Sequence, residues 1–208
     1  MAIDEDVTGQ LMDIPSNSAV SLVTDLGNYF QAMKGVIQHT VNKKKYCIYI
    51  TSTIPSNVIM DQLKNEGIEA KNIYFIDCIS FMVGGAGGEE GSNVMYIESP
   101  TMLENIMLKI NIWLKRLNKP HEDVIVFLDS VNTLAMHNDE RLISEFLHYI
   151  INSLRARNIL TVVLSVQGQT PEDIETIMQL VCDETIIATE TEAGSGGRED
   201  GDGADKDK

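Results

Sequence analysis

The chain has 208 residues, of which 43% are hydrophobic, and a formal net charge of −15. This length favours one domain with a single core, and the negative charge argues against sequence-independent binding of nucleic acid, whose phosphates need Lys and Arg. No stretch is long and apolar enough to span a membrane, and the acidic start Met1 to Asp6 is unlike a signal peptide, so we expect a cytoplasmic protein without membrane contact.

Short β-branched runs alternate with helical patterns along the chain, an order typical of an α/β protein with a parallel sheet. We expect strands near residues 19–24, 46–51, 72–77, 94–98, 124–129, 159–165 and 184–189. The run Val124 to Leu128 is apolar without alternation, as in a strand covered on both faces. It is therefore expected at the centre of the sheet.

Several helix starts can be read from the segments between these strands. Thr101 to Glu104 fits a capping box, and Thr170 with Pro171 fits a cap followed by a first-turn proline. A helix over about 139–157 is expected to bury one face of apolar residues at helical spacing. The residues of that expected face are Leu142, Phe146, Ile150 and Leu154.

Two segments are expected to be irregular. Gly84 to Gly91 predicts a flexible excursion, and it cannot be a phosphate loop because it has two carboxylates and no Lys. Residues 191–208 are rich in Gly, Asp and Glu and predict a disordered tail. The remainder, 1–190, is expected to form a single domain. Cys47, Cys78 and Cys182 lack C-x-x-C spacing, so we expect reduced thiols.

The turn after the first expected strand lacks the residues of a phosphate-binding loop. Such a loop reads G-x-x-x-x-G-K-[ST], in which glycines allow unusual backbone angles, Lys contacts the β- and γ-phosphates and the hydroxyl binds magnesium. Here the chain reads Thr24-Asp25-Leu26-Gly27-Asn28-Tyr29-Phe30-Gln31. Tyr29, Phe30 and Gln31 therefore stand in the last three places, and the sequence predicts a loop that is not built for ATP.

The strand, loop and helix that begin at Ala19, followed by the strand Val124 to Ser130, resemble the RecA-like ATPases, most closely their KaiC-like branch in archaea and bacteria. The resemblance covers roughly residues 8 to 190. Val124 to Ser130 resembles the Walker B strand of that family, and Asn72 to Asp77 resembles its third strand. It implies an α/β, three-layer RecA-like fold of the P-loop NTPase type, with a mostly parallel sheet and helices on both faces.

The resemblance also implies a vestigial nucleotide site with a degenerate Walker A loop. Phe30 stands at the Lys place and Gln31 at the Ser/Thr place, and Thr51 to Thr53 stand where active relatives carry acidic residues that orient water. What remains is Asp129 at the magnesium position and three residues of the nucleotide site. Those three are Gly27, Ser130 and Gln167.

The size of these losses predicts a pseudo-ATPase without catalytic residues. Each lost charge-assisted contact is worth about 1.5 to 3 kcal/mol, so two losses weaken nucleotide binding on the order of 100-fold to 10,000-fold. No cofactor is expected, although weak binding of ATP and magnesium is left open. Because active relatives bind nucleotide between subunits, the resemblance implies a regulatory or scaffolding role with a protein partner, either an active RecA/KaiC-like ATPase or a second copy.

Two other functions stay open at this point. One is a nucleotide-binding sensor, or an ATPase, with an atypical phosphate loop. The other is a magnesium-dependent phosphoryl-transfer enzyme that uses Asp25, Asp77 and Asp129, since each ends an expected strand, where open α/β sheets bind ligands. An Asp at a strand end also commonly caps the following turn, which is the simpler interpretation.

Overall fold

The computed structural model describes residues 2–84 and 93–189, and within them one seven-stranded parallel sheet. Its order is β4-β3-β2-β5-β6-β1-β7. The strands are β1 (Ala19–Thr24), β2 (Tyr46–Thr51), β3 (Ile73–Asp77), β4 (Val94–Tyr96), β5 (Val124–Asp129), β6 (Leu160–Val166) and β7 (Glu184–Ala188). All of them are paired in parallel. The predicted strands are confirmed to within two residues, and β5 lies at the centre of the sheet as expected.

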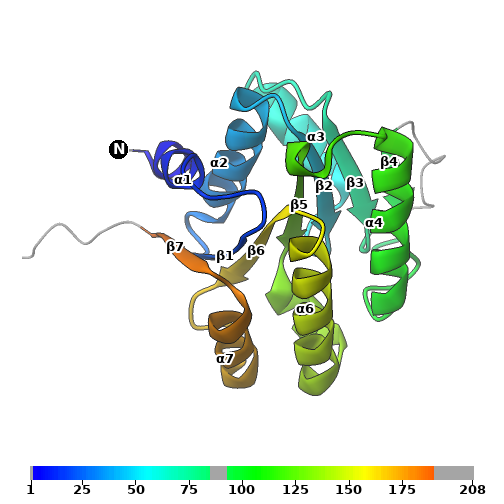
Figure 1. The fold of residues 1–208 in the computed structure, drawn as a ribbon. Coiled ribbons are helices and arrows are strands. Elements are labelled where there is room, and N and C mark those ends of the chain that lie inside the picture. Colours follow the sequence, from blue (N-terminus) through cyan, green and yellow to red (C-terminus); the bar gives the residue numbers. More distant parts are fainter. Residues whose placement is uncertain (1, 85–92, 190–208) are drawn as a thin grey trace, which may run out of the picture.

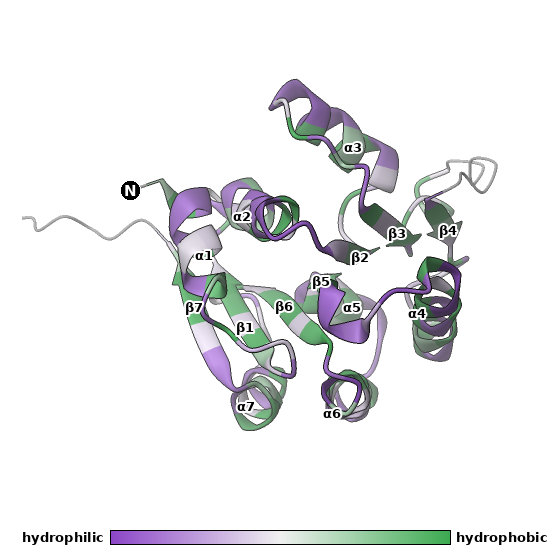
Figure 2. Cartoon of the chain, turned by 45° about the horizontal axis from the view of Figure 1, so that its top comes forward, coloured by the Kyte–Doolittle hydropathy of each residue, from purple (hydrophilic) through white to green (hydrophobic). Residues whose placement is uncertain are grey.

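Helices cover both faces of the sheet (Figure 1; Figure 2). One face carries α1 (Ile3–Leu11), α2 (Tyr29–Asn42) and α3 (Ser56–Asn65). The other carries α4 (Leu103–Leu117), α5 (Val131–His137), α6 (Glu140–Arg155) and α7 (Glu172–Val181), and a short 3-10 helix spans His121–Asp123. Each interface buries its own apolar cluster against the sheet. Within the described residues, no helix combines the length and apolar character needed to cross a bilayer.

Three local expectations about the helices were wrong. Helix α4 starts at Leu103 with Met102 at its N-cap, and the Thr101 hydroxyl lies 2.8 Å from that of Ser99 and does not cap the helix. The Thr170 hydroxyl donates to the carbonyl of Val166, so it does not cap α7. Leu142 is 53% exposed. The buried face of α6 consists of Ile143, Phe146, Leu147, Ile150, Ile151 and Leu154.

Helix α1 was not expected, and it lies along α2 (Figure 1). The two backbones approach closely at Gly35, where an added Cβ would lie 2.7 Å from Cβ of Val7. The Thr8 hydroxyl donates to the carbonyl of Gly35 at 2.9 Å, and Lys34 pairs with Asp4 at 3.2 Å. These contacts attach the N-terminal helix to the same layer that holds the start of α2.

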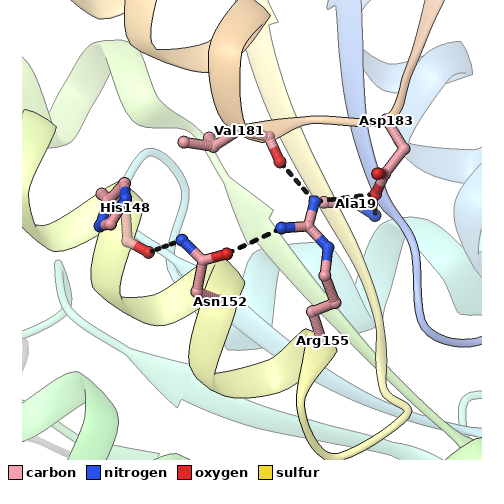
Figure 3. A network of polar contacts seen from close by, with 6 residues as sticks. All are labelled: Ala19, His148, Asn152, Arg155, Val181 and Asp183. Carbon is pink, nitrogen blue, oxygen red and sulfur yellow. Dashed lines mark hydrogen bonds and ion pairs between the residues drawn. The ribbon is translucent and has the colours of Figure 1, made fainter.

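A polar network holds β7 at the amino edge of the sheet (Figure 3). Arg155 at the end of α6 donates to the carbonyl of Val181 at 2.6 Å and to Asp183 at 2.9 Å. Asp183 in turn accepts the backbone N–H of Ala19 at 2.8 Å. One carboxylate thus links α6, the start of β1 and the approach to β7.

The predicted excursion at Gly84 to Gly91 and the predicted tail at 191–208 lie outside the described residues, apart from Gly84. All three cysteines lie within them and are free thiols, as expected. Cys47 and Cys78 are buried, and Cys182 is half-buried.

Candidate functional site

The candidate site lies at the carboxyl edge of the sheet. Strands β2 and β5 end side by side there, and β1 ends two strands from β5. In the described part of the chain, the residues that follow β1 to β4 and β6 at this edge contain no Lys or Arg; they are 25–28, 52–55, 78–84, 97–102 and 167–171. A phosphate group at this edge would therefore meet no cation from these loops.

The turn from β1 into α2 is closed by its own carboxylate. Asp25 accepts the backbone N–H of Asn28 at 2.9 Å and its side-chain amide at 2.8 Å. The hydrogen bond from the Asn28 side chain, with further backbone bonds, holds the pKa of Asp25 below its usual range. Asn28 is the residue just before α2, so Asp25 engages the N–H that precedes the helix. Its carboxylate places a negative charge beside the helix start, which disfavours an anion there.

Gly27 does not contribute a phosphate nest. No residue of this turn has a positive φ, and Asn28 has φ −108° and ψ 4°. An added Cβ at Gly27 would lie 3.2 Å from Oδ1 of Asp25. The glycine therefore leaves room for the Asp25 carboxylate and does not provide an unusual backbone angle.

The first residue of α2, Tyr29, reaches across to β5. Its hydroxyl donates to Oδ1 of Asp129, and the hydroxyl of Tyr49 on β2 donates to Oδ2. Asp129 is fully buried. Burial raises its pKa to about 6, although both hydroxyl donors act in the opposite direction. Both carboxylate oxygens are thus engaged by side chains of the protein itself.

Burial and the nearby Asp129 raise the pKa of Tyr29 far above its usual value. The same two causes, in the same order, raise the pKa of Tyr49. Both phenols therefore keep their protons near neutral pH, and both remain donors. The arrangement is a stable hydrogen-bonded cluster, and neither phenol can act as a base near neutral pH.

Hydroxyl groups complete the cluster on the side of β2 and α5. The Thr53 hydroxyl lies 2.8 Å from that of Thr133 and 3.3 Å from that of Ser130. The Ser52 hydroxyl donates to the carbonyl of Ser130 at 3.1 Å. These side chains occupy the place after β2 where the resemblance implied acidic residues, and none of them carries a charge.

The remaining predicted site residues are not brought to Asp129. Gln167 is exposed, and its backbone N–H donates to the carbonyl of Thr24 at 2.8 Å. Phe30 is half-buried and packs against the core on the α2 face. The ring that reaches Asp129 is that of Tyr29, the residue before the expected Lys place. Of the four predicted site residues, only Asp129 and Ser130 share the cluster.

The three strand-end carboxylates do not converge. Asp77 is buried and accepts hydrogen bonds from the backbone of Ser56, Ile79 and Ser80 and from the Ser80 hydroxyl, at 2.7 to 3.0 Å. Asp25 caps its own turn and Asp129 is held by two phenols. In the described part of the chain, no group of three or more His, Cys, Asp or Glu side chains could hold a metal ion. The predicted acidic cluster is therefore not formed, and Asp77 caps a turn as the simpler interpretation held.

Sequence reasoning missed Tyr49, Thr53 and Thr133. The only signal was Tyr49 itself, a polar-tipped side chain inside the otherwise buried strand Tyr46–Thr51. A buried phenol needs a hydrogen-bond partner, and Thr51 pairs with Asp129 across β2 and β5. Strand register was needed to turn that signal into a contact.

The comparisons with known proteins bear on the fold. No family profile matches the chain, and no curated protein matches its sequence. Among solved structures it is similar to a KaiC-like protein of the hyperthermophilic archaeon Pyrococcus horikoshii OT3, with 14% identity and a TM-score of 0.55. That likeness covers 82% of this chain and 70% of the archaeal one. The fold is RecA-like.

The residues of this RecA-like chain do not fit a magnesium–nucleotide complex. At the places that the sequence resemblance assigns to the Lys and the Ser/Thr of a phosphate loop, this chain has Phe30 and Gln31. The Asp25 carboxylate accepts the N–H of Asn28 just before α2, and both oxygens of Asp129 accept from phenols. A magnesium ion would have to displace both phenols from Asp129, and a phosphate would meet no Lys or Arg in the described loops at this edge.

Proposed function

We propose that this chain is a non-catalytic RecA/KaiC-like pseudo-ATPase that acts in the cytoplasm as a regulatory or scaffolding module through protein contacts. The observation that carries the proposal is the cluster of Tyr29, Asp129 and Tyr49. The aspartate that would hold magnesium is buried, and its two oxygens are engaged by hydroxyls from α2 and β2. Hydrolysis needs a ligand for a metal, a counter-charge and a base. The proposal is supported by the engaged oxygens of Asp129, by the absence of Lys and Arg from the described loops at this edge, and by hydroxyls after β2 that are poor bases near neutral pH.

Exposed apolar side chains support a role in protein contacts. Phe81, Met82 and Val83 follow β3 as a run of three, with 44%, 48% and 63% of each side chain exposed. Met136 at the end of α5 is 81% exposed. Consecutive exposed apolar residues are rare on soluble domains unless they meet a partner. By analogy with the fold, the partner is an active RecA/KaiC-like ATPase or a second copy.

Phosphate release and calorimetry test the proposal directly. With 1 mM Mg-ATP, the full chain is expected to release no more phosphate than its Asp129→Asn variant, and to bind ATP more weakly than about 1 mM, which corresponds to about −4 kcal/mol. Tyr29→Phe keeps the ring and removes the hydroxyl, so it separates steric closure from occupation of Asp129. Micromolar ATP binding without turnover would favour the nucleotide sensor instead. Turnover that disappears in Asp129→Asn would overturn the proposal.

A further inference from the structure

A small hollow lies on the opposite face of the sheet from Asp129, between α7 and the strands β6, β1 and β7. It has a volume of about 180 Å³. Ser21 and Val23 of β1 and Ser165 of β6 form its floor, and Glu175, Met178 and Gln179 of α7 form its wall. Figure 2 shows α7 beneath β7 and β1, away from α1 and α2.

Two buried hydroxyls in this hollow lack partners. Ser21 is 6% exposed and Ser165 is 5% exposed, and neither side chain has a hydrogen-bond partner among the described residues. On the same face of β6, the hydroxyl of Thr161 is also buried without a partner. Buried polar groups are almost always hydrogen-bonded. The Ser21 and Ser165 oxygens are not among the fully enclosed polar atoms without a partner, so both hydroxyls reach the open volume of the hollow and are available to a ligand there.

The residues that line the hollow determine which charge a ligand bound there can carry. The hollow contains the carboxylate of Glu175 and no Lys, Arg or His, so it disfavours an anion. An ammonium group has three N–H donors and no acceptor. The Glu175 carboxylate and the two serine oxygens supply three acceptors for it, while Val23 and Met178 supply an apolar wall for a short alkyl chain. The volume equals that of about six water molecules, which restricts the ligand to a small one.

We propose that this hollow is a binding site for a small primary alkylammonium compound. The site is separate from the Asp129 cluster and goes beyond the proposed function. The ammonium group lies between Glu175 and the hydroxyls of Ser21 and Ser165, and the alkyl chain lies against Met178. Water alone would satisfy the hydroxyls but would leave the carboxylate and the apolar wall without a common ligand.

The test compares three probes of similar size: n-butylamine, n-butanol and butyrate. Binding is measured on the full chain at 150 mM NaCl from the NMR shifts of the Val23 and Met178 methyl groups. The amine is expected to bind at least tenfold more tightly than the alcohol, because a hydrogen bond to a charged group is worth about 1.5 to 3 kcal/mol, and butyrate is expected not to bind. Equal binding of amine and alcohol, or no shift at these methyl groups, would refute the site.

Matched variants separate the site from general attraction to an acidic protein. Glu175→Gln and Ser165→Ala are each expected to weaken butylamine binding about tenfold. Glu172→Gln removes the same charge from α7 one turn earlier, outside the lining, and is expected to leave binding unchanged. If Glu172→Gln weakens binding as much as Glu175→Gln, the attraction is non-specific. None of these outcomes depends on nucleotide binding, so failure here would leave the pseudo-ATPase proposal intact.

Discussion

At the scale of single residues, Asp129 links the candidate site to the stability of the fold. Its pKa is raised to about 6 by burial, against the donors Tyr29 and Tyr49, while an unfolded Asp titrates near 3.8. Between these two pH values the folded chain binds more protons than the unfolded chain. The contribution of Asp129 to stability therefore falls as pH rises from 4 to 6, and its ionised carboxylate lowers stability at neutral pH.

Asp129→Asn is expected to be more stable than the wild type at pH 8 and to lose that advantage at pH 4. Two pKa units correspond to about 3 kcal/mol in the free energy of unfolding. The Asn side chain stays within reach of both phenols, whose oxygens can also accept. Urea denaturation at the two pH values measures the difference. A stability change that is the same at both pH values would show that Asp129 does not carry an ionisation penalty.

The contribution of His39 on α2 to stability depends on pH in the opposite sense to that of Asp129. Burial, followed by the charges of Lys45 and Lys43, lowers its pKa to about 4, and its Nδ1 is buried without a partner. Between pH 4 and 6.5 the unfolded chain binds more protons, so this group adds stability as pH rises. His39→Gln is expected to flatten this rise, by up to about 3 kcal/mol over the window. If the pH profile of unfolding is unchanged by the substitution, His39 is not the titrating group.

At the scale of elements, the contact between α1 and α2 depends on the absence of a side chain at Gly35. An added Cβ there would lie 2.7 Å from Cβ of Val7 and 2.8 Å from the carbonyl of Asp4. Helix propensity alone predicts that Gly→Ala stabilises a helix by about 0.5–1 kcal/mol. The steric clash is expected to reverse this sign, because a backbone atom cannot move aside.

Gly35→Ala is therefore expected to destabilise the chain by about 1–3 kcal/mol. Gly9→Ala is the matched control, since it lies in α1 with no atom within 4 Å of the added Cβ, and it should stabilise by up to about 1 kcal/mol. Thermal unfolding of both variants gives the comparison. Equal effects at the two positions would mean that α1 does not dock on α2 as described.

The polar network at the amino edge of the sheet predicts that different substitutions of Asp183 lower stability by different amounts. Partial burial tends to raise the pKa of Asp183, but the Ala19 N–H and Arg155 together hold it below its usual value. Its stabilising effect is therefore present above the unfolded pKa and is lost as pH falls through the folded pKa. Asp183→Ala leaves the buried Ala19 N–H unpaired and should cost about 1–3 kcal/mol.

Asp183→Asn can still accept from Ala19 and loses only a partly exposed ion pair, so it should cost no more than about 1 kcal/mol at pH 7. Its difference from the wild type should begin to shrink as pH falls below the unfolded pKa near 3.8 and should disappear only below the lower folded pKa. Chemical denaturation of both variants at pH 3.5 and pH 7 provides the measurement. Equal losses for Asp183→Ala and Asp183→Asn would place the effect in the ion pair alone.

At the scale of the whole molecule, the strand pattern was predictable because each strand is a local run. Strand β5 could be placed at the centre because it is apolar on both faces, which the sheet order confirms. Helix α1 was missed because its stripe has only three apolar residues, Ile3, Val7 and Leu11, in an acidic segment. Its helical state depends on packing against α2, which no local pattern reveals.

The candidate site was predictable only in part, for the same reason. The loss of a phosphate loop is visible locally in residues 24–31. The contact of Tyr29 with Asp129 joins residues one hundred positions apart, and it requires the register of β2, β5 and the start of α2. The capping role of Asp77 likewise depends on the backbone of Ser56 in another element. Sequence patterns identified which residues were unusual, and the fold determined what each of them contacts.

The net charge of −15 sets the response of the whole chain to salt. The surplus of carboxylates repels itself more strongly in the compact state than in the unfolded one. The described ion pairs are few and mostly at the surface, so they contribute little. Raising NaCl from 0.01 to 0.1 M shortens the Debye length from about 30 to about 10 Å, and the melting temperature is expected to rise. Calorimetry at pH 7.5 in matched buffers measures this shift. A fall in melting temperature over the same range would mean that attractive pairs, and not the surplus negative charge, dominate the electrostatics of the fold.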